Sequence, residues 1–289
     1  MKKLCLVIVA LISGLIIISL LLTFLQKDVM VRERIGLIRV EGPILSSKDT
    51  IDEIKAFRKD KSIKAIVLRV DSPGGAVAPS QEIYEEIKKT VKEKPVVVSM
   101  GAIAASGGYY IAAPASKIVA NPGTLTGSIG VIMEIPNIKG LMDKIGIKRE
   151  VIKSGRYKDM ASIFKDMEPE QRKILQAVLD EVHEQFIKAV AEGRGLPLER
   201  VRQIADGRIF TGSQAFEIRL IDKLGNIEDA IDVAKELADI KGEPEIVSKK
   251  ERFSFIDLLK GKFPQLLLSE TKEIINEYTS LKIKYEFIP

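Results

Sequence analysis

Short apolar runs alternate with amphipathic stretches along most of this chain, and that alternation limits the fold more than any other feature. Residues 35–41 and 66–70 have the length and branched side chains of strands, whereas 49–59 and 79–91 have the period of helices. Strands that alternate with helices indicate an α/β fold with a mostly parallel sheet and flanking helices. With 46% hydrophobic residues, the chain of 289 residues can form one sizeable core.

The same periodicities divide the rest of the chain. One face of a helix that starts at Pro169 is marked at three- and four-residue spacing by Leu175, Leu179, Val182, Phe186 and Val190. We expect further strands at 96–100, 117–120, 129–134 and 148–153, and shorter helices at 198–205, 213–218 and 227–237. The predicted organisation is a connector at 26–34, a globular domain at 35–240 and a C-terminal appendage at 241–289.

An uncharged run, residues 4–25, precedes the connector and predicts an N-terminal transmembrane anchor. As a helix it would be roughly 33 Å long, which matches the bilayer core. A cleavable signal peptide is the alternative, because Lys2 and Lys3 form a basic start, but the run is too long and lacks a small-residue cleavage site. Flanking positive charges hardly distinguish the two orientations. The signal-like layout favours an extracytoplasmic domain on a single-pass anchor in the cell membrane.

Composition excludes several classes of site. The one cysteine, Cys5, rules out an intrachain disulfide, and the one histidine, His183, rules out sites built from several histidines. The formal net charge of +5 is spread among acidic residues rather than massed in runs, so no nucleic-acid partner is expected.

A run of small residues at 101–108 surrounds Ser106. Ala104, Ala105, Gly107 and Gly108 would leave its hydroxyl unobstructed, and a helix that starts here would direct backbone N–H groups toward developing negative charge. Close helix–strand packing explains such a run equally well, and the glycine two residues before the serine of a G-x-S-x-G elbow is missing.

A second turn, residues 71–75 (DSPGG), follows a predicted buried strand and could offer the amide of Gly75 or Gly74 as an oxyanion donor opposite Ser106. For the general base, His183 lies in an amphipathic helix without a recognisable partner motif. A lysine whose pKa is lowered from ~10.4 by burial could serve instead. Composition alone does not select which lysine.

Together, these segments make the chain resemble the signal peptide peptidase family, the SppA-type Ser-Lys membrane serine peptidases. Four segments match its motifs in order, at 71–75 (DSPGG), 99–111 (SMGAIAASGGYYI), 125–131 (LTGSIGV) and 153–159 (KSGRYKD). The resemblance covers about 35–237. It implies a fold like that of the Clp protease and crotonase groups, assembly into homo-oligomers, and a serine and lysine that can come from adjacent protomers.

The resemblance also implies the roles of single residues. Ser106 would attack the peptide carbonyl, Lys158 would take its proton, and Ser128 would hold Lys158 in place. The amides of Gly75 and Gly107 would form the oxyanion hole. One departure is Arg219, which replaces a glycine usual in the family after a helix and would cost on the order of 1 kcal/mol if φ there is positive.

The predicted function is therefore that of a membrane serine endopeptidase that degrades hydrophobic peptides such as cleaved signal peptides, without metal or other cofactor. One alternative is a quality-control protease of the stomatin-partner type. Another is a noncatalytic crotonase-like scaffold, which would have no use for both Ser106 and Lys158.

Overall fold

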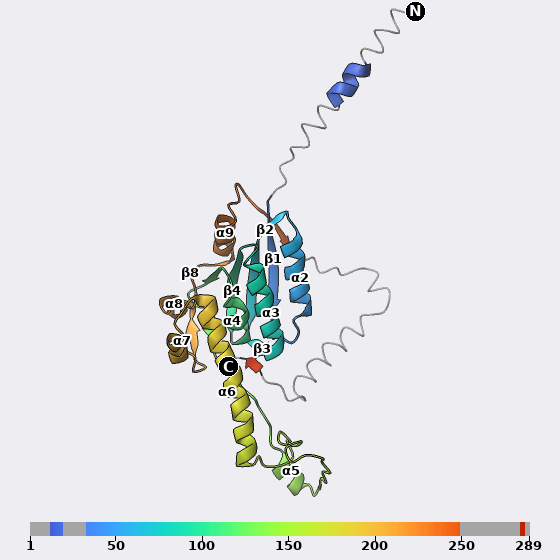
Figure 1. Ribbon diagram of the computed structural model, residues 1–289, viewed down its shortest axis with the longest axis vertical. Coiled ribbons are helices and arrows are strands. Elements are labelled where there is room, and N and C mark those ends of the chain that lie inside the picture. The colour runs from blue at the N-terminus through green and yellow to red at the C-terminus, as the bar shows by residue number, and fades with distance from the viewer. Residues whose placement is uncertain (1–11, 20–32, 249–283, 287–289) are drawn as a thin grey trace, which may run out of the picture.

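A computed structural model describes residues 12–19, 33–248 and 284–286 (Figure 1). The strands are β1 (Arg34–Glu41), β2 (Ile63–Ser72), β3 (Gly74–Ala76), β4 (Val96–Ala105), β5 (Lys117–Ala120), β6 (Leu125–Gly127), β7 (Ile209–Thr211), β8 (Lys223–Leu224), β9 (Glu245–Ser248) and β10 (Lys284–Glu286). Beyond the helical residues 12–19, the helices are α2 (Lys48–Lys59), α3 (Val77–Thr90), α4 (Gly107–Ala112), α5 (Lys139–Lys144), α6 (Pro169–Arg194), α7 (Leu198–Ile204), α8 (Gly212–Glu217) and α9 (Ile227–Leu237).

Eight strands form one sheet in the order β7-β6-β4-β2-β1-β9, with β5 beside β4 and β8 beside β5. Every pairing in it is parallel except that of β6 with β7. The first half of β4 pairs with β5 and its last three residues pair with β6. The carboxyl ends of β2, β4 and β6 therefore meet at one edge of the sheet, where binding sites of parallel sheets usually form.

Helices cover both faces of the sheet, which explains why the central strands are apolar without interruption. On one face, α2, α3, α4 and α6 pack over Ile38, Leu68 and Val98. On the other face, α9 packs over Leu37, Val67 and Val97, which lie side by side in register. This arrangement confirms the predicted α/β class with a mostly parallel sheet and flanking helices.

Most predicted elements are confirmed within a few residues, but two predicted strands are wrong. Residues 129–134 and 148–153 contain no strand and run irregularly, with α5 between them. Apart from Ile129 and Gly130, they belong to a projecting segment, residues 131–168, which we call the arm. Figure 1 shows the arm at the end of α6 that lies far from the sheet. Apart from the buried Ile129, the apolar side chains that suggested strands there are partly or fully exposed, as Ile152 illustrates with 96% of its surface accessible.

The structure describes only parts of the two ends of the chain. At the N-terminus, residues 12–19 are helical and the remainder of the predicted anchor, 4–25, lies outside the described residues. Within the described ranges, no helix combines the length and the apolar character needed to cross a bilayer. At the other end, β9 pairs in parallel with β1, so the sheet continues beyond Ile240 into the segment expected to be an appendage.

Candidate active site

Ser106 lies at the sharp turn between β4 and α4, and its backbone is strained. Its φ of 53° and ψ of −117° lie outside the regions that L-residues ordinarily adopt, which costs of order 1–3 kcal/mol. Two hydrogen bonds hold the turn, from the Ser106 amide to the Gly127 carbonyl at 2.8 Å and from the Tyr110 amide to the Ser106 carbonyl at 2.8 Å. The strand-to-helix turn thus resembles a nucleophile elbow, although Ala104 stands where that motif has glycine.

The hydroxyl of Ser106 is buried and has no hydrogen-bond partner in the described part of the chain. The residue is only 1% exposed. Because leaving a buried hydroxyl unpaired costs about 1–3 kcal/mol, such a group calls for an explanation. A nucleophile whose base and substrate come from elsewhere provides one.

The two glycines after Ser106 allow α4 to approach the β2–β3 connection closely. A Cβ on Gly107 would lie 2.8 Å from Ser80 Oγ and 3.1 Å from the Gly75 nitrogen. A Cβ on Gly108 would lie 2.6 Å from the Ser72 carbonyl oxygen. The small residues therefore serve close packing, and that packing brings the backbones of Gly107 and Gly75 together next to Ser106.

Hydrogen bonds to Ile44 along one edge fix the short strand β3 that contains Gly75. The Ile44 amide donates to the Gly74 carbonyl at 2.7 Å, and the Ala76 amide donates to the Ile44 carbonyl at 2.8 Å. A Cβ on Gly75 would lie 2.3 Å from that Ile44 oxygen, so no larger residue fits. Gly75 and Gly107 are thus neighbouring, rigidly held amides of the kind that an oxyanion hole requires.

Two buried serines that the sequence did not single out support this strand. Ser72 Oγ accepts a hydrogen bond from the Gly74 amide at 3.1 Å, and Ser80 Oγ donates to the Ala76 carbonyl at 2.9 Å. Ser72 stands inside the DSPGG turn, which was a usable signal. Ser80 lies on α3, and only the fold brings it to the site.

The structure places Ser128 beside Ser106. Ala105 of β4 pairs with Gly127 of β6, and the two serines are the residues that follow this pair on adjacent parallel strands. Ser128 is 8% exposed and also has a positive φ, 50°. Its amide donates to the Arg208 carbonyl at 2.9 Å, which fixes the turn.

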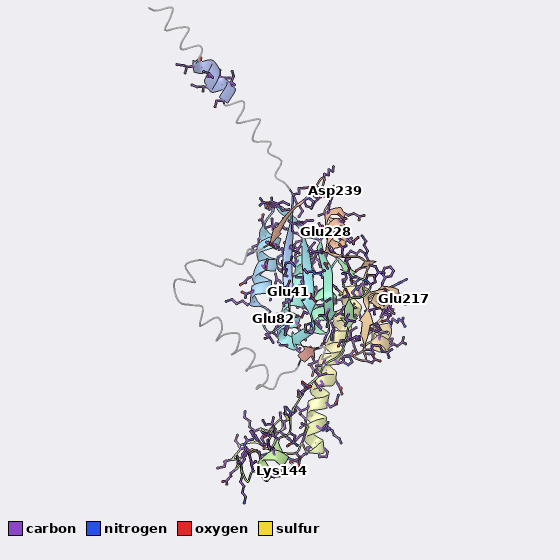
Figure 2. All side chains as sticks on the ribbon, turned by 180° about the vertical axis from the view of Figure 1, so that it is seen from behind. Glu41, Glu82, Lys144, Glu217, Glu228 and Asp239 are labelled. Atoms are coloured by element: carbon purple, nitrogen blue, oxygen red, sulfur yellow. The ribbon has the colours of Figure 1, made fainter. Side chains whose placement is uncertain are left out.

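Lys158 is not brought to this site within a single chain. It lies exposed in the arm, and Ser106 Oγ has no partner among the described residues. Figure 2 shows another residue of the arm, Lys144, at the tip of the projection, whereas Glu41 and Glu82 lie on the body. One chain therefore holds Ser106, Gly75, Gly107 and Ser128 together and Lys158 apart from them.

Asp159, next to Lys158 in the sequence, and Glu170, at the start of α6, are both paired with other cations. Asp159 Oδ1 is 2.6 Å from Lys153 Nζ and 3.1 Å from Lys165 Nζ, and Glu170 Oε2 is 2.7 Å from Arg156. Hydrogen bonds from Lys153 and Lys165 hold the pKa of the Asp159 carboxyl below its usual range. Lys158 itself forms no ion pair with any residue of 33–248, so its amine is available to a group outside this chain.

His183 has no catalytic partner in the structure. It lies on α6, and its Nε2 atom is buried without a hydrogen-bond partner in the described residues. Because Ser106 Oγ is equally unpartnered, the two side chains are not hydrogen-bonded to each other. The pairing needed for a Ser-His base is absent from the described chain.

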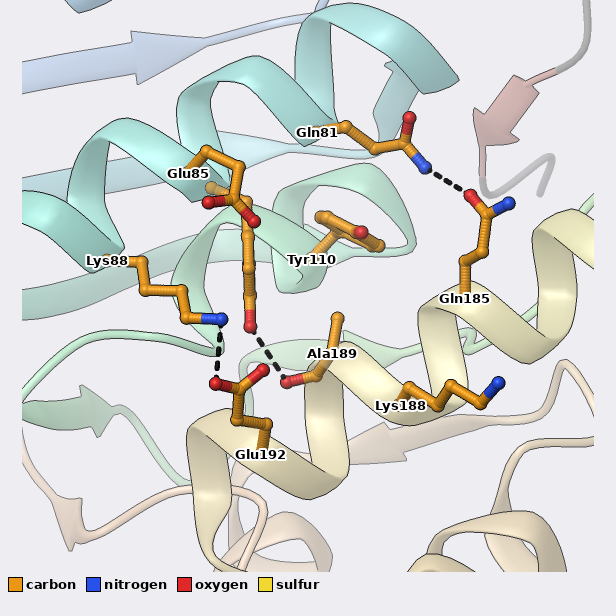
Figure 3. Close-up of a pocket in the computed structure, with 9 residues that line it drawn as sticks. Gln81, Glu85, Lys88, Tyr110, Gln185, Lys188, Ala189 and Glu192 are labelled. Carbon is orange, nitrogen blue, oxygen red and sulfur yellow. Dashed lines mark hydrogen bonds and ion pairs between the residues drawn. The ribbon is translucent and has the colours of Figure 1, made fainter.

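A separate open pocket of about 380 Å³ lies between α3 and α6, above Tyr110 (Figure 3). Lys88 and Glu192 form an ion pair across it at 2.7 Å, and Gln81 donates to Gln185 at 2.8 Å. Burial raises the pKa of Tyr110 to about 12, so its phenol stays protonated. The lining residues do not include Ser106, and they are Gln81, Tyr84, Glu85, Lys88, Tyr110, Gln185, Lys188, Ala189 and Glu192. The pocket lies where the C-terminal half of α6 packs against α3, and the two polar pairs across it hold this part of α6 on the body.

Comparison with known proteins covers both halves of the fold. The sequence profile of peptidase family S49 matches residues 88–241, and that of the Clp protease matches residues 25–124. A Synechocystis sp. protein with a provisional protease name is 46% identical over 211 residues, which are 72% of this chain and 76% of that protein.

Two further relatives are longer proteins. Protease 4 of Salmonella typhi is 41% identical over 193 residues, 66% of this chain and 31% of the relative. The chloroplast serine protease SPPA of Arabidopsis thaliana is 36% identical over 209 residues, 70% of this chain and 31% of the relative. The chain thus spans about a third of each of these two proteins.

Proposed function

Because this chain belongs to peptidase family S49, we propose that it is a membrane-anchored serine endopeptidase with Ser106 as its nucleophile. Membership of the family and relatives named as proteases support a serine protease.

The observation that carries the proposal is the state of Ser106. The backbone of Ser106 is strained and its hydroxyl is buried and unpaired, and both features cost free energy. The amides of Gly75 and Gly107 lie next to it. A binding scaffold would not need this combination. In the proposed reaction, Ser106 Oγ attacks the peptide carbonyl carbon while Lys158 Nζ accepts the hydroxyl proton. The Gly75 and Gly107 amides donate to the oxyanion that forms.

The second half of the reaction follows from the same groups. Collapse of the tetrahedral intermediate breaks the peptide bond, and Lys158 returns the proton to the leaving amine, leaving an acyl ester on Ser106. Water then attacks the ester while Lys158 accepts a proton from it. Collapse of this second intermediate breaks the bond to Ser106 Oγ, which takes the proton back from Lys158, and the carboxylic acid product leaves and ionises. Ser128, next to Ser106, would hydrogen-bond Lys158 and orient it without adding charge.

We propose that Lys158 reaches Ser106 from a neighbouring copy in a homo-oligomer. Within one chain the arm extends away from the site, and it exposes apolar side chains to water, which is energetically unfavourable. These are Leu141, Ile145, Ile147, Val151 and Ile152. A second copy that covered them would exclude water from Lys158, and only a neutral amine can accept the proton.

The proposed substrates are hydrophobic peptides such as cleaved signal peptides. Residues 4–25 would anchor the enzyme in the cell membrane with the catalytic domain outside the cytoplasm. An anchored enzyme meets membrane-retained peptides at a higher effective concentration than a freely diffusing one. No cofactor takes part in the proposed chemistry.

The proposal is tested by labelling the full-length protein with a fluorophosphonate and mapping the modified peptide. We expect labelling at Ser106, none in Ser106→Ala, and a rate lowered about 100-fold or more in Lys158→Ala, since a general base contributes that much. His183→Ala is the matched control and should label like the wild type. A wild-type rate in Lys158→Ala would contradict the dyad, and failure to label Ser106 would contradict the peptidase.

A further inference from the structure

The strand that leads into the proposed nucleophile is irregular just before the turn. β2 and β4 run in register until, at one point, β2 has the single residue Asp71 where β4 has three, residues 101–103. The ladder pairs on either side of this irregularity are Val70 with Met100 and Ser72 with Ala104. Such an insertion is a β-bulge, and bulges beside active sites commonly re-aim a side chain.

Two side chains provide hydrogen-bond partners for the backbone of this bulge. On one side, Asp71 Oδ1 accepts a hydrogen bond from the Ile103 amide at 3.1 Å. On the other side, the hydroxyl of Thr124, the residue before β6, donates to the Gly101 carbonyl at 2.7 Å. The bulge is therefore held from both neighbouring strands, directly before the chain turns at Ser106.

Gly101 leaves the room that the carboxylate of Asp71 occupies. A Cβ on Gly101 would lie 2.6 Å from Asp71 Cγ and 2.8 Å from Asp71 Oδ2, so no larger residue fits while that carboxylate is in place. Gly101 is the first of the small residues at 101–108, and close contact with Asp71 explains it. The carboxylate is thus packed in a fixed position against β4.

We propose that Asp71 is a positioning residue for Ser106, and that it acts together with Thr124 through the bulge of β4. The inference rests on the proposed function, because the exact position of Ser106 matters to a reaction only if its hydroxyl attacks peptides. Ser106 Oγ has no hydrogen-bond partner among the described residues, so Asp71 does not act on the hydroxyl directly.

The bulge fixes the direction in which β4 enters the turn. Ile103 is bonded to Asp71, and the chain reaches the strained backbone of Ser106 three residues later. A shift of β4 would move the hydroxyl relative to the amides of Gly75 and Gly107. A displacement of about 1 Å can slow a reaction about 100-fold, because the reacting atoms lose their alignment.

Substitution of Asp71 tests the proposal in the full-length enzyme. Asp71→Ala leaves the Ile103 amide without its acceptor, whereas Asp71→Asn keeps an oxygen that accepts the same bond. We expect kcat for a peptide substrate to fall about tenfold or more in Asp71→Ala, with KM within about twofold of the wild type, because the nucleophile is displaced and the binding surface is not. Asp71→Asn should keep kcat within about threefold of the wild type, since a neutral acceptor forms a weaker bond.

Glu41→Ala is the matched control. Glu41 is the register partner of Asp71 on β1, and its exposed side chain pairs with Arg39 rather than with β4. Both kinetic constants should equal those of the wild type. A kcat as low in Asp71→Asn as in Asp71→Ala, or a wild-type kcat in Asp71→Ala, would overturn the proposed role of Asp71.

Fluorophosphonate labelling separates failure of this inference from failure of the proposed function. Asp71→Ala oligomers of wild-type size should label at Ser106 about tenfold more slowly or less than that. Labelling at the wild-type rate would overturn the inference alone, and no labelling of the wild type would overturn the peptidase proposal. If Asp71→Ala does not fold or assemble, Thr124→Val decides, because it removes the other bond to the bulge and keeps the side-chain shape. That variant should label about threefold more slowly or less, and a wild-type rate would overturn the role of the bulge.

Discussion

At the scale of single residues, Ser106 and Arg219 both have positive φ, at 53° and 64°, for different physical reasons. Hydrogen bonds with Gly127 of β6 and Tyr110 of α4 hold Ser106 in its turn, and the proposed function makes this residue the nucleophile. Arg219 ends α8 in the left-handed backbone conformation, which glycine usually adopts at this position. Its amide donates to Phe216 at 3.1 Å, and the Leu220 amide donates to Ala215 at 2.8 Å.

Replacement of Arg219 by glycine should therefore stabilise the protein. A left-handed conformation costs an L-residue about 1 kcal/mol that glycine avoids, and Arg219 is exposed and forms no ion pair within residues 33–248. We expect Arg219→Gly to raise the Tm by about 2–4 °C in a thermal melt. Arg219→Ala, which removes the charge and keeps the Cβ, is the control. An equal gain in that variant would mean that charge, not backbone strain, is responsible.

Some of the site residues could be predicted from the sequence, and others could not. Ser106, Gly75, Gly107 and Ser128 stand in short motifs, and the structure brings those four together. Ser80 could not be found in this way, because a serine on an amphipathic helix has no distinguishing signal before α3 is placed against α4. The pairing of Lys158 with Ser106 stays a prediction, since it depends on an arrangement of several chains.

At the scale of elements, the body was predictable and the arm was not. β1, β2 and β4 are buried on both faces, so their apolar runs have one explanation. Runs of the same kind at 129–134 and 148–153, most of which lie in the arm, led to wrong strand predictions. Ile152 and its apolar neighbours there are exposed in the single chain, and apolar periodicity does not reveal whether the partner surface belongs to the same molecule.

The loop that carries Lys158 should depend on one carboxylate. Asp159 bridges Lys153 and Lys165, so Asp159→Asn should speed amide hydrogen exchange severalfold across residues 153–165 at pH 7. Asp166→Asn is the matched control, because Asp166 accepts a hydrogen bond from Asn137 and forms no ion pair among residues 33–248. Equal exchange in both variants would contradict the bridging role.

Acid should loosen the same loop in the wild type. The pKa of Asp159 is lowered in the folded protein by Lys153 and Lys165, so its stabilisation is fully present above the unfolded value of ~3.9. That contribution disappears as the pH falls through the lowered pKa. Protection factors for residues 153–165, corrected for intrinsic exchange, should thus hold at pH 5 and fall only below about pH 4. A loss already complete at pH 5 would exclude Asp159 as the cause.

At the scale of the whole molecule, mixed assemblies test whether two copies complete one site. Ser106→Ala supplies intact arms without a nucleophile, and Lys158→Ala supplies nucleophiles without a base. If the dyad forms between copies, unfolding and co-refolding equal amounts should restore about a quarter of wild-type peptidase activity by random pairing. Each variant refolded alone is the control. No recovery in mixtures whose oligomers form normally would place the dyad within one chain.

α6 holds the arm clear of the body that contains Ser106 (Figure 1). If Lys158 acts between copies, as proposed, a newly made copy holds only one half of the catalytic dyad and stays inactive while it is alone. Its activity would then rise as copies become more concentrated and fall on dilution.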